Sequence, residues 1–463
     1  MDDFPIGAIV AYAGPLHSGL EDTGWMPCDG RGLSVTDTSF QPLLDVIQSS
    51  YGADSNYKYI PFLAGYFLRG VDPNATVDSD AKARLAPTKH EIAGATGADP
   101  GSVQMDGVGS HRHPIRSYPG VQGANDHGDG PGCIFRYDPQ PNNATTSPTG
   151  GSETRPPNMS VYFLIKYKNA TQSSMFPAGA VIAYADTVAG DPMVAQGWMP
   201  CDGRALNPDD TSSNYAMVHA AIAETYGATA ANWFCVPDYQ GIFLRGVDGG
   251  RGLDPDAAAR TAPRPDLPIH GAAGDNVGSK QDFLLGAHTH PYVYRREEHC
   301  LHPDDEYADT DFLWNTWGDN TSDPAGDCEE VRPKNMAVNR LICWNPKLPS
   351  FQVPKNAIIA YAGPLKGLND TTWAACDGTG GTPDYRGQFL RGADANRAVN
   401  TAQLDGLTKH THGYQYSNGE TKESYSDDTP IVAGDCTTQL TDIPGPGDTR
   451  PKNTAVHFLI KTQ

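Results

Sequence analysis

The stretch TRPPNMSVYFLIKY, residues 154–167, returns as VRPKNMAVNRLICW at 331–344 and as TRPKNTAVHFLIKT at 449–462. In each copy, Pro and Asn precede a run of apolar residues that is rich in β-branched and aromatic side chains. Such a run, bounded by turn-forming residues, predicts a short β-strand. Three copies of one strand at wide intervals indicate an internal repeat, so we searched outward for further recurring blocks.

Four more blocks recur in the same order on the N-terminal side of this strand. They are FPIGAIVAYAGP (4–15), GWMPCDGRGLS (24–34), AGYFLRGVD (64–72) and SHRHP (110–114), with counterparts beginning at 176, 197, 240 and 287, and at 353, 372, 386 and 409. Chance does not produce five ordered blocks three times, so the chain is a triplication. The polar or Pro-bearing joints at 169–174 and 345–352 predict repeat 1 at 1–172, repeat 2 at 173–348 and a shortened repeat 3 at 349–463.

Only one element of each repeat has helical periodicity. Phe40, Leu43, Leu44 and Ile47 are spaced i, i+3, i+4 and i+7, which predicts a short amphipathic helix in repeat 1. Repeat 2 has a counterpart at 215–222, and repeat 3 has lost this segment. The predicted fold class is therefore mostly β and irregular with short helices, an α+β and loop-rich architecture.

Charge and hydropathy narrow the classes of partner. The chain has 34 Lys and Arg against 55 Asp and Glu, a formal net charge of −21. Nucleic-acid grooves need a basic surface, so we expect no nucleic-acid partner. No apolar run approaches the roughly 18 residues of a membrane span, so we expect no membrane insertion. The first residues lack the basic start and longer apolar run of a secretory signal peptide.

The recurring blocks resemble the phage tail-collar domain. That family is marked by an opening G-x-I-x-x-Y/F-A-G, then G-W-x-x-C-D-G-R, F-x-R-G and a closing R-P-x-N-x-x-V-x-x-x-I-K, and the resemblance covers most of all three repeats. It includes short tail-fibre tips and proteins labelled microcystin-dependent. In some tail-fibre tips, three identical chains intertwine, and H-x-H pairs from each chain bind a metal on the three-fold axis through six imidazoles.

The resemblance implies that this chain forms a single-chain pseudo-trimer around a pseudo-three-fold axis. The metal-ligand candidates, which would then converge on that axis, are His111, His113, His288, His290, His410 and His412. Independently, residues i and i+2 of an extended strand point to the same face, so one H-x-H strand offers two imidazoles. Three such strands around an axis offer six.

Six imidazoles fill an octahedron, which sets both the metal and its role. Because zinc prefers four ligands, the all-His octahedron favours one Fe(II) per chain, with Zn or Ni able to occupy it if available. A closed shell leaves no position for a substrate, so the metal would hold the assembly together and would not catalyse a reaction. We therefore predict that the protein is not an enzyme.

Other recurring polar residues have two readings. Cys28, Cys201 and Cys376 can be thiol ligands or nucleophiles, or small buried residues beside an Asp-Gly turn, and we favour the second reading. The arginines of F-L-R-G and R-P-x-N can bind anions or satisfy internal carbonyls and carboxylates, and again we favour the second. These arginines are Arg69, Arg245, Arg391, Arg155, Arg332 and Arg450. Cys300 and Cys328 lie in one variable loop, where a disulfide is a further hypothesis.

The repeats differ most between H-x-H and R-P-x-N, at 114–154, 291–331 and 413–449. Amphipathic aromatic residues next to carboxylates and amides are typical of recognition surfaces, whereas drift after duplication would leave loops with no role. The receptor-binding candidates are Tyr118, Tyr137, Tyr292, Tyr294, Trp314, Trp317, Tyr414 and Tyr416.

Two functions follow as expectations. The first is a tail-fibre-like adhesin or receptor-binding tip that binds a cell-surface glycan or protein, in a virion tail or extracellular assembly. The second is a structural subunit of a phage tail, contractile injection device or extracellular fibre, which contacts mainly other tail or fibre subunits.

Overall fold

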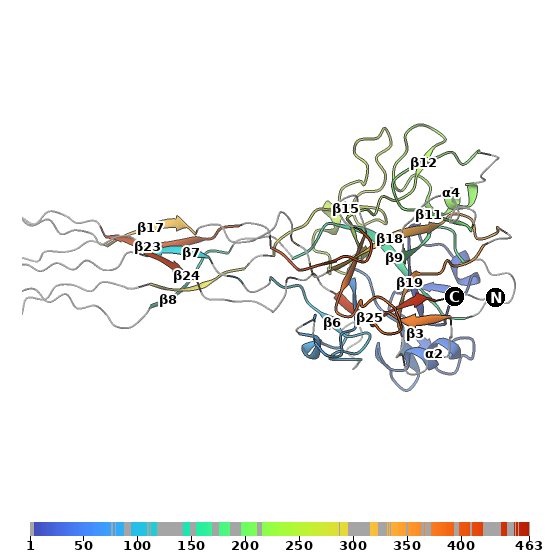
Figure 1. Ribbon diagram of the computed structural model, residues 1–463, viewed down its shortest axis with the longest axis horizontal. Helices are drawn as coiled ribbons and strands as arrows, with labels where there is room; N and C mark the ends of the chain where they lie inside the picture. The colour runs from blue at the N-terminus through green and yellow to red at the C-terminus, as the bar shows by residue number, and fades with distance from the viewer. Residues whose placement is uncertain are drawn as a thin grey trace, which may run out of the picture.

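A computed structural model provides the structure of the protein. It describes residues 4–462 except for 76, 79, 88–93, 109–110, 112, 118–141, 149–153, 169–175, 186–195, 211–214, 287, 295–314, 323–330, 332, 334, 349–350, 363–364, 366–371, 393–397, 408–409, 420–436, 442–448, 450 and 452. The fold is mostly β with few short helices. It has a broad head, which contains both chain termini, and a slender extension on the side away from them (Figure 1). No helix in the described part of the chain has both the length and the apolar character of a membrane span.

One strand from each repeat lies in the middle of the head. These inner strands are β1 (Ala8–Tyr12), β10 (Ala180–Tyr184) and β19 (Ala357–Tyr361). Each pairs antiparallel with both of the others, over only two residues in each case. All their residues are buried. This explains why the sequence shows a continuous apolar run instead of the alternation of a half-exposed strand.

The longest strand of the head, also one per repeat, links neighbouring repeats. These strands are β9 (Asn158–Lys166), β18 (Asn335–Cys343) and β25 (Asn453–Lys461). Each pairs antiparallel with the inner strand of its own repeat. Its first half pairs in parallel with the F-L-R-G strand of another repeat: β9 with β14 (Phe243–Gly246), β18 with β21 (Phe389–Gly392) and β25 with β5 (Phe67–Gly70). The pairing therefore runs from repeat 1 to 2, from 2 to 3, and from 3 back to 1.

Short strands complete both sides of these long ones. Within each repeat, antiparallel partners are β2 (Trp25–Pro27), β11 (Trp198–Pro200) and β20 (Trp373–Ala375). From the neighbouring repeat come β15 (Lys280–Gln281) on β9, β22 (Ala402–Gln403) on β18 and β6 (Val103–Gln104) on β25. The same cyclic order thus holds on this edge too.

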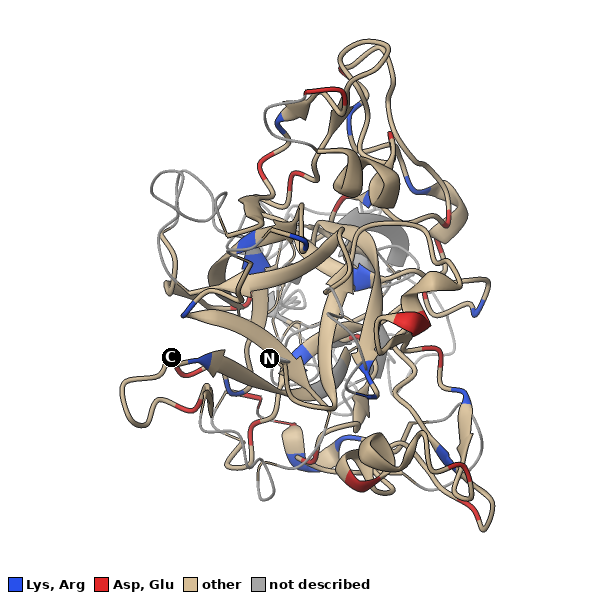
Figure 2. Cartoon of the chain, turned by 90° about the vertical axis from the view of Figure 1, so that its right-hand side faces the viewer, with Lys and Arg blue, Asp and Glu red and all other residues tan. Residues whose placement is uncertain are grey.

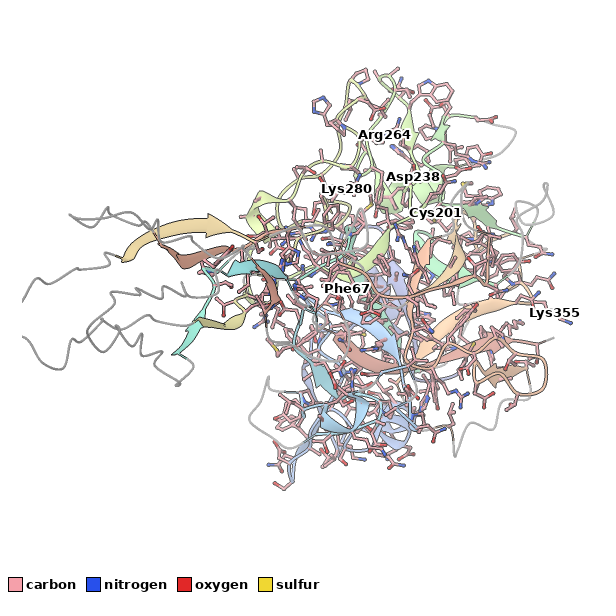
Figure 3. All side chains as sticks on the ribbon, turned by 60° about the vertical axis from the view of Figure 1, so that its left-hand side comes forward. Phe67, Cys201, Asp238, Arg264, Lys280 and Lys355 are labelled. Atoms are coloured by element: carbon pink, nitrogen blue, oxygen red, sulfur yellow. The ribbon has the colours of Figure 1, made fainter. Side chains whose placement is uncertain are left out.

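The F-L-R-G strands also meet one another, and their residues explain the motif. Phe67, Phe243 and Phe389 form a small buried cluster, and Phe67 lies near the middle of the head in Figure 3. Gly70 and Gly246 run so close to backbone carbonyls of other repeats that a Cβ at either position would collide with them. Glycine is therefore required where these strands end.

Helices cover the outer side of repeats 1 and 2. The predicted helix of repeat 1 is confirmed as α2 (Gln41–Ile47), with Leu43, Leu44 and Ile47 buried, and its counterpart is α4 (Ala216–Ile222). Residues 377–388 of repeat 3 contain no helix, as expected. The remaining elements are α1 (Gly19–Asp22), the 3-10 turns η1 (Ala81–Ala83) and η2 (Ala257–Ala259), and the two-stranded pairs β3 (Gly32–Ser34) with β4 (Tyr57–Tyr59) and β12 (Ala205–Leu206) with β13 (Phe234–Cys235).

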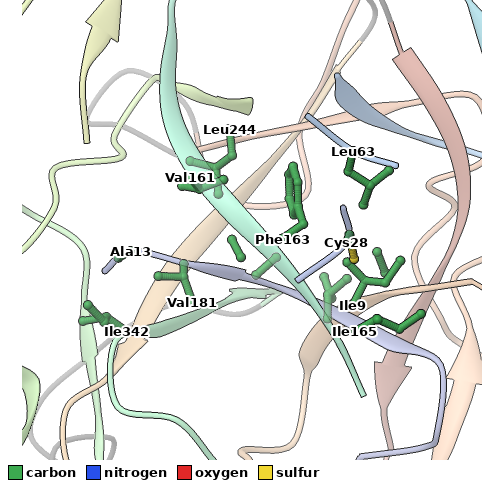
Figure 4. Close-up of a cluster of buried hydrophobic side chains, with 14 of the residues drawn as sticks. Ile9, Ala13, Cys28, Leu63, Val161, Phe163, Ile165, Val181, Leu244 and Ile342 are labelled. Atoms are coloured by element: carbon green, nitrogen blue, oxygen red, sulfur yellow. The ribbon is translucent and has the colours of Figure 1, made fainter. Parts of the chain in front are cut away.

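Two apolar layers enclose the inner strands. Ile9 and Ala11 of β1 face the larger cluster, part of which Figure 4 shows, whereas Val10 and Tyr12 face the other. In that second layer, Phe4 and Phe176 stack with ring centroids 4.6 Å apart. Lys, Arg, Asp and Glu lie mostly in the loops around this centre (Figure 2). Both layers contain residues from all three repeats, so the repeats share the core of the head.

The slender extension consists of two-stranded antiparallel pairs. The strands that leave the head are β7 (Pro114–Ser117), β16 (Pro291–Tyr294) and β23 (Gly413–Gly419), and those that return are β8 (Asn142–Thr145), β17 (Asn315–Thr321) and β24 (Thr437–Leu440). Each pair joins two repeats: β16 with β8, β23 with β17 and β7 with β24. The cyclic order of the head therefore continues into the extension (Figure 1).

Candidate metal centre

The H-x-H pairs lie at the base of the extension. His113, His290 and His412 come immediately before β7, β16 and β23, so the second histidine of each pair directly precedes a strand that leaves the head. The pairs therefore stand just ahead of the strands and not inside them. All six histidines come together, and their ligand atoms lie within 4.8 Å of one another. This donor set can hold a metal ion.

Spacing within the cluster is regular. The Nε2 atoms of His111, His288 and His410 are 3.0–3.4 Å from one another and form one triangle. The Nε2 atom of each second histidine lies 3.2 Å from the Nε2 atom of a first histidine in another repeat. These contacts pair His113 with His410, His290 with His111 and His412 with His288.

Ring contacts have the same pattern. His111, for example, lies beside the rings of His113, His288, His290 and His410, with centroids 4.6–5.1 Å apart. These rings are steeply inclined to that of His111, at 68–81°. A vertex of an octahedron has this arrangement of neighbours, so the imidazoles approach one point from six directions.

Octahedral geometry gives a test of fit. Neighbouring donors of an octahedron are separated by √2 times the metal–donor distance, and opposite donors by twice that distance. Spacings of 3.0–3.4 Å thus correspond to a metal–nitrogen distance of about 2.1–2.4 Å, close to the ~2.0–2.1 Å of zinc–imidazole bonds. The largest separation between donors, 4.8 Å, read as that of opposite donors, also corresponds to a metal–nitrogen distance of about 2.4 Å. The donor positions fit a six-coordinate first-row metal.

Hydroxyl residues from a neighbouring repeat fix the backbone of each second histidine. The N–H of His290 donates to Thr146 Oγ1 (2.8 Å), and the N–H of Thr146 donates back to the carbonyl of His290 (2.8 Å). His113 is held in the same way by Thr441, and His412 by Ser322. All six of these residues are buried. Each hydroxyl residue (Thr146, Ser322 and Thr441) comes directly after a strand that returns to the head. Strand pairing in the extension therefore positions the histidine ligands.

Further contacts orient the rings: Ser322 Oγ lies 3.2 Å from His113 Nδ1, and two other rings contact backbone carbonyls. His288 Nδ1 lies 3.0 Å from the carbonyl of Gly286, and His412 Nδ1 lies 3.0 Å from the carbonyl of Ser147. A carbonyl can only accept, so Nδ1 carries the proton in both rings and Nε2 offers its lone pair to the centre. Burial lowers the pKa of His412.

The surroundings of His288 favour its neutral form. Burial lowers the pKa of His288 to about 4. The hydrogen bond to Gly286 opposes this shift, and the nearby imidazoles of His412, His410 and His111 add to it. At neutral pH this ring is therefore an uncharged imidazole, which is the form that ligates a metal.

The structure places only some of the receptor-binding candidates. Tyr118, Tyr137 and Trp314 lie outside the described residues. Four others are in strands of the extension: Tyr292 and Tyr294 in β16, Trp317 in β17 and Tyr416 in β23. Tyr414 also lies in β23, but it is only 3% exposed, so its ring would not reach a receptor without rearrangement. The expectation of an accessible ring at this position is not met, because β23 starts inside the buried base of the extension.

The recurring cysteines are small buried residues, which is the interpretation we favoured. Cys28, Cys201 and Cys376 are buried free thiols, and burial raises the pKa of each. Thiols that stay protonated in an apolar core are neither nucleophiles nor ligands. Cys300 and Cys328 lie outside the described residues.

The arginines of F-L-R-G have internal partners, as we favoured. The Nε of Arg69, Arg245 and Arg391 each donates to a glycine carbonyl of another repeat, at 2.7–2.9 Å. Each guanidinium also lies over a Phe ring of another repeat, 5.1–5.3 Å from its centroid. Arg155 of the R-P-x-N motif forms an ion pair with Asp256 (2.6 Å), and Arg332 and Arg450 are outside the described residues.

Thr146, Ser322 and Thr441 are functional residues that the sequence analysis missed. They lie in the most divergent part of each repeat, where no recurring block drew attention to them. A hydroxyl residue nine or ten positions ahead of the Arg of R-P-x-N in every repeat was the available signal.

Comparison with known protein families gives a match to one part of the chain. Residues 179–244 match the phage tail collar domain. This stretch runs from β10 to β14 of repeat 2 and includes none of the six histidines of the cluster. The match suggests a tail-fibre-like structural or adhesin role, in a phage tail or extracellular location.

A curated relative and the solved structures complete the comparison. Protein RhiB of Rhizobium leguminosarum bv. viciae is 39% identical to the chain over 155 residues, which is 32% of this chain. The chain spans 64% of the length of that relative. No solved structure matches the chain. The comparisons thus identify one phage tail collar domain, at residues 179–244.

Proposed function

We propose that the protein is a non-enzymatic, tail-fibre-like tip, in which three covalently linked collar-like repeats form a pseudo-trimer held together by one metal ion. The observation that carries this proposal is the meeting of six imidazoles, two from each repeat, at the base of the extension. The extension would then display loops that bind a glycan or protein on a cell surface. The partners we propose are this receptor and other tail or fibre subunits, in a virion tail or extracellular assembly.

Strand pairing supports the pseudo-trimer. The inner strands pair mutually, and the long strands pass from each repeat to the next and from the third to the first. A row of independent beads would pair only within repeats. Covalent linkage replaces the translational and rotational entropy that separate chains lose on assembly with the smaller cost of closing loops. It also lets three loops diverge independently.

The donor chemistry supports a structural metal. All six positions around the centre are imidazoles, so no coordination position is left for a substrate or an activated water. This is why we propose a structural site and no catalysis. Six nitrogen donors favour Fe(II) over zinc, which prefers four ligands, although zinc or nickel can also occupy such a site.

The position of the histidine cluster supports a role for the metal in holding the extension, which would display the receptor-binding loops. The cluster joins the three strands that leave the head, immediately before the extension begins (Figure 1). A metal there would hold the bases of all three strand pairs at fixed separations. Trp317 in β17 lies one residue from the position opposite Tyr416 in β23, which puts two aromatic candidates of different repeats at the same height of the extension.

Metal analysis tests whether one metal ion links the three repeats. Elemental analysis of the purified protein should find about one metal ion per chain, most often iron, and H288A/H290A should lose it. The matched control is H219A, because His219 is a partly exposed residue of α4 outside the cluster. If the wild-type protein retains no iron, zinc or nickel after loading, the proposed metal site is refuted. The cluster is then a set of packed imidazoles.

Receptor binding needs a separate test. On a glycan array or on intact cells, the protein should bind, and W317A should weaken binding while leaving the metal content unchanged. If the wild-type protein binds nothing, and cross-linking in assembled particles shows contacts mainly with other subunits, the structural-subunit alternative is correct.

A further inference from the structure

A cavity of about 50 Å³ lies inside the head, where the three repeats meet. Corresponding residues from each repeat line it: Ile9, Val181 and Ile358 from the inner strands, and Leu68, Leu244 and Leu390 from the F-L-R-G strands. The long strands contribute Phe163, Phe458 and Arg340. Figure 4 shows Ile9, Phe163, Val181 and Leu244 gathered in this region.

Arg340 breaks the apolar pattern of this lining. Repeats 1 and 3 have a phenylalanine at the corresponding position, in VYFLI and VHFLI, whereas repeat 2 has VNRLI. Arg340 is half-buried and lines this cavity. A charged side chain has thus replaced an aromatic one, whereas the other side chains that line the cavity are all apolar.

The guanidinium is only partly satisfied. Its Nη2 donates to the carbonyl of Leu390 (3.0 Å). Its Nε is buried and has no hydrogen-bond partner among the described residues. A buried polar group without a partner costs about 1–3 kcal/mol, and more when the group is charged. By contrast, the arginines of the F-L-R-G strands donate from Nε to backbone carbonyls.

Among the described residues, no carboxylate acts on the charge of Arg340. The ionisable groups that act on Arg340 are Cys201, Tyr239 and Tyr385. Burial raises the pKa of all three, so they are neutral at neutral pH. Burial lowers the pKa of Arg340 itself to about 10, which still leaves it protonated under those conditions. An unpaired buried charge is among the costliest features of a protein interior.

We propose that the cavity binds one small monovalent anion, of the size of a halide, beside the guanidinium of Arg340. Space is sufficient, because one water needs about 10–15 Å³ of such a cavity. The single positive charge of Arg340 in the lining matches one negative charge, whereas sulfate or phosphate would bring a second, uncompensated charge. The site would place a bound anion at the meeting point of the three repeats, where it stabilises their association.

Stability in different salts tests this proposal on the full chain. Chemical denaturation would be followed in sodium chloride and sodium gluconate at equal ionic strength, because gluconate is too large for the cavity. Above the dissociation constant, each tenfold rise in chloride should raise the folding equilibrium constant of the wild-type protein about tenfold, or about 1.4 kcal/mol. R340F should lose this dependence, since it restores the residue found at Phe163 and Phe458 and fills the site.

Controls make the result specific. R204M removes an exposed arginine that pairs with Asp202 and should keep the full chloride response. An equal response to chloride in R340F and the wild-type protein would overturn the proposal. If R340F does not fold, crystals of the wild-type protein grown in bromide decide the matter. An anomalous peak in the cavity supports the site, and water alone there refutes it.

Discussion

Replacing Thr146 with valine tests how the ligand backbone is held. Valine keeps the shape of threonine but lacks the hydroxyl that accepts the N–H of His290 at 2.8 Å. The N–H of Thr146 still donates to His290, so the backbone pairing is kept. Thr146 and His290 are 2% and 0% exposed, so water cannot replace the lost acceptor. Leaving one buried N–H without a partner should lower the free energy of unfolding by about 1–3 kcal/mol.

Denaturant unfolding of T146V, with and without bound metal, measures this loss. The lost bond is made by the backbone and not by the imidazole, so we expect a similar decrease in both forms. T441V removes the corresponding hydroxyl next to His113 and should behave alike. S147A is the control, because the Ser147 side chain is exposed and only its carbonyl contacts His412. If T146V matches S147A to within about 0.5 kcal/mol, the hydroxyl contributes nothing to the site and our reasoning is wrong.

Two further predictions concern the head. F67A should lower the free energy of unfolding by about 3–5 kcal/mol in denaturant titrations, because the ring is 1% exposed and lies under the Arg245 guanidinium; a loss below 1 kcal/mol would show that the phenylalanine cluster can close the gap. Burial lowers the pKa of His457 to about 4, so below pH 6.5 the unfolded state binds the proton first and stability falls as the pH decreases towards 4. H457N, which has the residue of Asn339 in repeat 2, should reduce this decline by on the order of 2–3 kcal/mol, and an unchanged pH profile would contradict the assignment.

Local structure was largely predictable from the sequence. The apolar run at 160–167 formed the expected strand, and the spacing of Leu43, Leu44 and Ile47 gave the helix α2. These signals work because periodicity records which side chains are buried, and burial decides local structure. The histidines were also selected as candidates from sequence, because the triplication repeats them.

Pairing between repeats was not predictable from periodicity. Nothing local in β9 shows that its first half lies against β14 instead of β5, because the F-L-R-G strands have the same four residues. The hydroxyl partners of the histidines were missed for a related reason. Thr146 and His290 are distant in sequence, and they meet only because β8 pairs with β16.

One substitution within a repeated block carries structural information that overall similarity between the blocks hides. VNRLI was grouped with VYFLI and VHFLI because most positions agree. Its arginine became informative only when the three positions were found to line one cavity. In a triplicated chain, the position where one copy departs from the other two marks where symmetry has been broken.

The return of β25 to β5 has a consequence for biosynthesis. Residues 67–70 of the first repeat need residues 453–456 as their parallel neighbour, so nearly the whole chain separates the two halves of one ladder. While the ribosome is still making the third repeat, the first must wait with its F-L-R-G strand uncovered along one edge. Contacts this distant in sequence slow folding, and uncovered edges invite association with other nascent chains. Until residues 453–456 emerge, this edge of β5 is therefore open to association with other chains.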